Sequence, residues 1–76
     1  MIPITANASF DLEGGITPEF YIRDGIKIPV DGISKKWEDQ DGVHFIAMIP
    51  GDQIVELLFS TKKRRWYCKT VFNPFS

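Results

Sequence analysis

The side chains best suited to catalysis in this sequence are His44, its only histidine, and Cys68, its only cysteine. A hydroxyl or thiol nucleophile needs a base within hydrogen-bonding distance, and that base needs a third polar group to orient it. Nothing in the sequence assembles such a set, and His44 is expected on the solvent side of a strand that follows the Asp41-Gly42 turn. We therefore expect no enzyme, no catalytic residue and no cofactor.

Three carboxylates stand together before a glycine, namely Glu38, Asp39 and Asp41 ahead of Gly42. The arrangement matches part of a calcium loop, but the first and twelfth ligand positions would fall on Trp37 and Met48, whose side chains carry no oxygen ligand. A structural zinc site needs about four ligands, which one histidine and one cysteine do not supply. The sequence therefore predicts a turn here and no metal site.

Charge is distributed unevenly along the chain. The net charge is -1, yet the last sixteen residues carry +5 with no acid among them, which leaves -6 for the first sixty. The five cations are Lys62, Lys63, Arg64, Arg65 and Lys69. A molecule with this layout can be steered toward a charged partner.

The basic segment 62–65 runs directly into two aromatic residues, a composition typical of contacts with single-stranded nucleic acid. The predicted partner-contact residues are Lys62, Lys63, Arg64, Arg65, Trp66 and Tyr67, together with Phe75 beyond the last strand. The alternative is a solvated loop whose like charges protect an edge strand, with Trp66 in the core. The small net charge favours that alternative, because nucleic-acid-binding domains usually carry a basic excess.

These observations favour a small binding module that contacts a protein or a second copy of itself, with single-stranded nucleic acid as the alternative ligand. A lone cysteine permits no internal disulfide, although secreted domains of this size usually contain several. Neither a secretion signal nor an apolar run of about 18 residues is visible. We therefore expect a cytoplasmic protein without membrane contact.

The elements that would position these residues are strands. Apolar residues occupy every even position from Ile2 to Leu12, and this period of two predicts a long strand with one buried face. A three-residue loop ending at Gly15 would pair Leu12 with Ile16 and Ala8 with Phe20. A similar loop at 23–25 would pair Ile22 with Ile26 and keep the same face apolar.

Further along, the parity of the apolar residues changes at Asp31-Gly32, which predicts a bulge in one bent strand or, alternatively, a separate turn. Segment 43–49 is apolar on both faces and is expected to be the central, most buried strand. Segment 53–60 is predicted as a strand, with a short helix at 52–62 as the alternative. A last strand at 66–72 precedes the tail 73–76, where proline prevents further pairing.

Short strands separated by glycine and aspartate turns predict an all-β fold: an antiparallel meander of about five or six strands closing into an SH3-like or OB-like barrel. With the 52–62 helix the class would be α+β. Large internal side chains are expected for Trp37, Phe45, Phe59 and Trp66. The 76 residues are expected to form one domain, because 43% of them are hydrophobic and the chain is too short for two cores.

Overall fold

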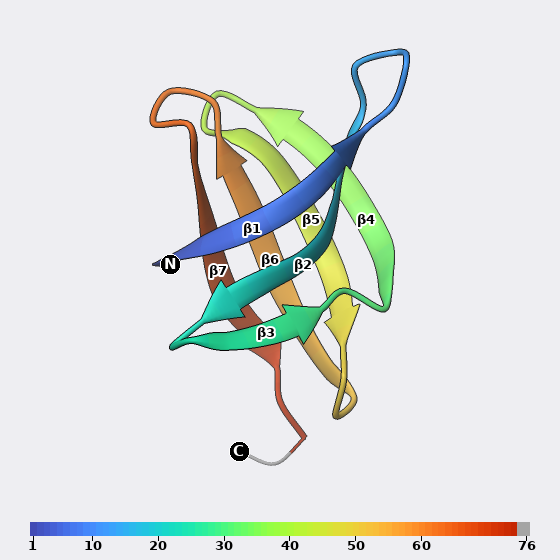
Figure 1. The fold of residues 1–76 in the computed structure, drawn as a ribbon, viewed down its shortest axis with the longest axis vertical. Helices are drawn as coiled ribbons and strands as arrows, with labels where there is room; N and C mark the ends of the chain where they lie inside the picture. The colour runs from blue at the N-terminus through green and yellow to red at the C-terminus, as the bar shows by residue number, and fades with distance from the viewer. Residues whose placement is uncertain (75–76) are drawn as a thin grey trace.

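Seven strands and no helix make up residues 1–74, the part of the chain that the computed structural model describes (Figure 1). The strands are β1 Ile2–Phe10, β2 Ile16–Arg23, β3 Ile26–Pro29, β4 Gly32–Asp39, β5 Gly42–Ile49, β6 Gln53–Ser60 and β7 Arg65–Phe72. They form one antiparallel sheet in the order β3-β2-β1-β7-β6-β5-β4. The all-β prediction is confirmed, whereas the expected five or six strands are too few.

The sheet curls into a half-barrel in which β1–β3 cross in front of β4–β7 (Figure 1). Its two edge strands, β3 and β4, are consecutive in sequence, so the chain between them joins the edges. Val30 donates its N–H to the Glu19 carbonyl at 2.9 Å, and Asp31 donates to the Met48 carbonyl at 2.8 Å. At this point the chain stops pairing with β2 and begins pairing with β5. The change in the parity of the apolar residues at 31–32 is therefore neither a bulge in one strand nor a separate turn.

The β1–β2 hairpin has a longer loop than expected. Phe10 pairs with Ile16 and Ala8 with Pro18, so five residues form the loop and the predicted Leu12–Ile16 and Ala8–Phe20 pairs are wrong. The register shifts at Glu19, where β2 carries one extra residue. Such a bulge reverses which side chains point inward, and Tyr21 rather than Phe20 becomes buried, with 1% of its surface exposed.

The β2–β3 hairpin closes through two residues instead of three. Asp24 and Gly25 have φ angles of 53° and 77°, the left-handed pair that a tight hairpin turn requires. Arg23 consequently pairs with Ile26, and the predicted Ile22–Ile26 pair is wrong. Aspartate and glycine tolerate these angles, which is why the shorter turn is accessible.

The second half of the chain follows its predicted strands. Segment 53–60 is β6, so the strand prediction is confirmed and the helix alternative is wrong. β5 is the most buried strand, as expected, but it lies second from the β4 edge, and β7 occupies the centre of the sheet. The chain between residues 1 and 74 contains no helix of the length and hydropathy that would cross a membrane.

The core lies on the concave side of the sheet. Its buried apolar side chains are Ile16, Tyr21, Val43, Phe45, Ala47, Ile49, Val55, Leu57, Trp66 and Cys68. Phe59, as expected, packs against this cluster. Trp37 does not join it: a bulge after Ile33 turns Trp37 to the outer face, where it pairs with His44.

Candidate interaction site

Residues 61–64 form a tight turn between β6 and β7, so the basic segment 62–65 covers most of this turn and the first residue of β7. Ser60 holds it, because its carbonyl accepts the Arg64 N–H at 2.7 Å and its hydroxyl accepts the Lys63 N–H at 3.2 Å. Arg64 takes a left-handed conformation with φ 55°. The cationic side chains are thus presented to solvent by an ordered turn.

Next to this turn is a surface pocket of about 300 Å³, named here the basic pocket. It is lined by Met1, Asp41, Leu58, Ser60, Lys62, Lys63 and Tyr67. Leu58 and Tyr67 are cross-strand neighbours on β6 and β7, and both are half-buried. Lys63 extends over Tyr67, with its Nζ 5.8 Å from the ring centroid. The pocket therefore combines apolar side chains with two ammonium groups.

The structure separates the predicted contact residues. Lys62, Lys63 and Tyr67 share the basic pocket, whereas Trp66 is 9% exposed and packs against Phe45 and Phe59 at centroid distances of 5.9 and 5.3 Å. The interior position of Trp66 agrees with the alternative interpretation from the sequence. Arg64 lines none of the three described pockets. The predicted contact residue Phe75 lies outside the residues that the structure describes.

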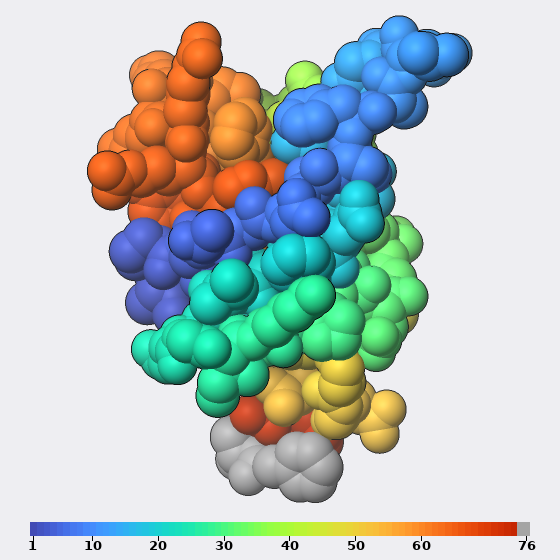
Figure 2. Space-filling view, in the orientation of Figure 1, coloured from blue at the N-terminus to red at the C-terminus, as the bar shows by residue number. Residues whose placement is uncertain are grey.

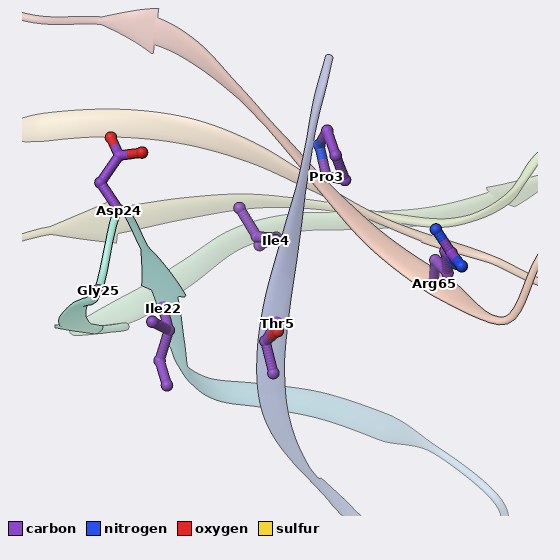
Figure 3. Close-up of a pocket in the computed structure, with 7 residues that line it drawn as sticks. All are labelled: Pro3, Ile4, Thr5, Ile22, Asp24, Gly25 and Arg65. Carbon is purple, nitrogen blue, oxygen red and sulfur yellow. The ribbon is translucent and has the colours of Figure 1, made fainter.

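Arg65 belongs to a different pocket, of about 450 Å³, which runs across β1 (Figure 3). Its other lining residues are Pro3, Ile4, Thr5, Ile22, Asp24 and Gly25. In the close-up, Arg65 and Asp24 stand on opposite sides of β1, so the pocket has one charge at each end (Figure 3). The residues of the basic segment thus line two separate pockets and do not form one continuous basic patch.

The sequence did not identify the tip of the β1–β2 hairpin, residues 10–15, as a surface feature. Asp11 organises this hairpin tip: its Oδ1 accepts the N–H groups of Glu13 at 2.9 Å and Gly15 at 2.6 Å. Leu12 is 107% exposed relative to a reference chain, and Phe10 is 71% exposed. The space-filling view shows the tip projecting from the body (Figure 2). The even-numbered apolar pattern had assigned Phe10 and Leu12 to the core.

His44 lies on the outer face, as expected, but its neighbours bury it, and its side chain is 9% exposed. Its Nδ1 is 3.0 Å from Glu56 Oε2 in a hydrogen bond. Its Nε2 is 2.9 Å from Asp39 Oδ2, an ion-pair distance that lacks hydrogen-bond alignment. Burial alone would lower the pKa of His44, but the contacts with Glu56 and Asp39 together raise it above its ordinary value.

Asp39 also builds the turn predicted from its sequence neighbours. Its Oδ1 accepts the N–H groups of Asp41 at 2.8 Å and Gly42 at 3.3 Å. Ligand-type atoms of Asp39, Asp41 and His44 lie within 4.8 Å of one another. The turn and the imidazole account for the contacts that Asp39 makes, and we assign no metal to this cluster.

No family model, no curated protein and no solved structure matches this chain significantly.

Proposed function

We propose that this domain is a non-catalytic protein-interaction module that associates with further copies of itself through the hairpin tip. The observation that supports this most directly is the full exposure of Leu12 beside the largely exposed Phe10. Burying a side chain of this kind contributes about 1.5–3 kcal/mol. Burial of two such residues on one projecting hairpin would therefore strongly favour association.

The tip is also held in one conformation by its own backbone hydrogen bonds. The Asp11 N–H donates to the Gly15 carbonyl at 2.9 Å, and the Gly14 N–H donates to the Asp11 carbonyl at 3.2 Å. A loop that is already hydrogen-bonded loses little conformational entropy when it docks. Leu12 is therefore presented in one arrangement, as the anchor residues of interfaces usually are.

Binding of single-stranded nucleic acid by the 62–67 segment has less support. Stacking requires exposed ring faces. Trp66 lies in the core, which leaves half-buried Tyr67 as the ring beside Lys62 and Lys63. The SH3-like or OB-like comparison concerns shape alone and adds nothing in favour of either ligand.

Sedimentation equilibrium over a concentration series tests the proposal. The wild-type protein is expected to associate as its concentration rises, and the double variant Phe10→Ser/Leu12→Ser is expected to remain monomeric. Ile26→Ser is the matched control, because Ile26 is 64% exposed at a different hairpin and its loss should leave association unchanged. A wild-type monomer at every concentration, or a double variant that associates normally, would overturn the proposal.

A further inference from the structure

We propose that the hairpin tip of one copy docks in the basic pocket of a second copy, with Leu12 entering the pocket and Glu13 facing its lysines. This inference rests on the proposed function, since it names the surface that receives the tip. It makes the association head-to-tail, with two different surfaces in contact.

The chemistry of the two surfaces is complementary. The tip presents the apolar Leu12 between the acidic Asp11 and Glu13. The pocket presents the apolar Leu58 and Tyr67 beside the basic Lys62 and Lys63. Apolar surface would meet apolar surface, and carboxylates would meet ammonium groups around it, an arrangement that gives both affinity and orientation.

Asp41 also lines the pocket and opposes an acidic ligand. The two lysines outnumber it, and Arg64 adds positive charge on the same turn. The pocket volume of about 300 Å³ is at the size where small ligand sites begin, which suits one leucine side chain with its flanking groups.

The contact has to form between molecules. In Figure 1 the β1–β2 loop and the β6–β7 turn stand at separate corners of the same end of the protein, and none of the residues lining the pocket belongs to the tip. Because the tip and the pocket are different surfaces, a single contact leaves the pocket of one copy and the tip of the other still available. Such contacts build rings or filaments unless both contacts form reciprocally in a dimer.

Two variants, each defective in one surface, test the inference. Leu12→Ser disables the tip, and Lys62→Glu/Lys63→Glu disables the pocket. All three residues are exposed, so the variants should remain folded, which circular dichroism and thermal unfolding would verify. Each variant alone is expected to associate at least about tenfold more weakly than the wild type.

Mixing the two variants is the decisive measurement. The pocket variant keeps an intact tip and the tip variant keeps an intact pocket, so the mixture is expected to form a heterodimer by sedimentation velocity. Lys27→Glu/Lys69→Glu makes the same change in charge at two exposed lysines outside the pocket lining and should associate like the wild type. Association should also weaken with added salt, because charge pairs at the rim are screened.

The possible failures are distinguishable. If the wild type associates and Leu12→Ser abolishes this, but the pocket variant associates normally, the tip contacts another surface and only the inference fails. If the wild type stays monomeric, both proposals fail. Anisotropy of a labelled short oligothymidylate identifies the competing ligand: tight, salt-dependent binding that the pocket variant loses would assign the pocket to nucleic acid and overturn the inference.

Discussion

The imidazole of His44 lies parallel to the indole of Trp37, with the ring centroids 4.8 Å apart and the planes 4° apart. The two residues are directly paired across β4 and β5, on the outer face of the sheet. Trp37 covers one face of the imidazole, while Glu56 and Asp39 lie at its two nitrogens. This stack joins the edge strand β4 to β5 and β6 through one polar side chain.

A pH-dependent stability is the first expected consequence. Because the folded protein raises the pKa of His44, protonated His44 stabilises the fold fully below its ordinary value of about 6.5. This stabilisation is lost as the pH rises through the folded-state pKa. Titration of the His44 ring by NMR should give a pKa above 6.5, and Asp39→Asn should lower it.

Urea unfolding of the wild type and His44→Gln across the same pH range supplies the thermodynamic counterpart. The wild type should lose free energy of unfolding relative to the variant as the pH increases above 6.5. If the free energies of unfolding of the two proteins changed with pH in parallel, the protonation of His44 would make no contribution to stability.

Adjacent leucines on β6 should differ sharply in their contribution to stability. Leu57 is 0% exposed and belongs to the core, whereas Leu58 is half-buried on the outer face. Leu57→Ala is expected to lower the free energy of unfolding by about 2–5 kcal/mol, because it leaves a cavity, and Leu58→Ala by less. Equal losses in urea unfolding would contradict the inward and outward assignment of this strand.

Gly42 should tolerate substitution less than Gly25 does. Both have positive φ angles, 145° and 77°, so alanine is strained at either position. At Gly42 a Cβ would also collide with the Phe59 carbonyl oxygen, while at Gly25 it would meet open space. Gly25→Ala should cost about 1–2 kcal/mol, and Gly42→Ala distinctly more, as measured by thermal unfolding. A Gly42→Ala protein as stable as Gly25→Ala would refute the close β5–β6 approach.

The thiol of Cys68 should be unreactive in the folded protein. Cys68 is 1% exposed, and burial raises its pKa, so the reactive thiolate is scarce as well as inaccessible. Labelling with a thiol-specific chromogenic disulfide should be slow in buffer and immediate in denaturant. Immediate labelling of the native protein would show that Cys68 is accessible from solvent.

Much of the fold could be predicted because period-two alternation is a local property of the chain. Strand-favouring residues and bracketing turns, which are equally local, identified segment 53–60 as a strand despite a helix-like start, and apolar side chains on both faces identified 43–49 as the most buried strand. The turn residues and the concentration of positive charge in 62–65 could also be identified from the sequence, since each depends on residues that are adjacent in the chain.

The face that each strand presents was decided by the tertiary structure. Bulges at Glu19 and after Ile33 reverse the alternation, so Tyr21 enters the core and Trp37 leaves it. A bulge depends on what the partner strand offers, and the Glu19 carbonyl is used by Val30, eleven residues away. Local sequence carries little information about such a pairing.

The candidate site shows the same division. Residue types by themselves indicated that 62–67 is basic and aromatic, but only the sheet order brings Lys62, Lys63 and Tyr67 together with Leu58 and Met1 while it places Trp66 inside. Leu12 fits the apolar pattern of a core residue and projects into solvent, because the half-barrel ends before the hairpin does. Sequence alternation determines which residues share a face, whereas the extent and curvature of the sheet determine whether anything covers that face.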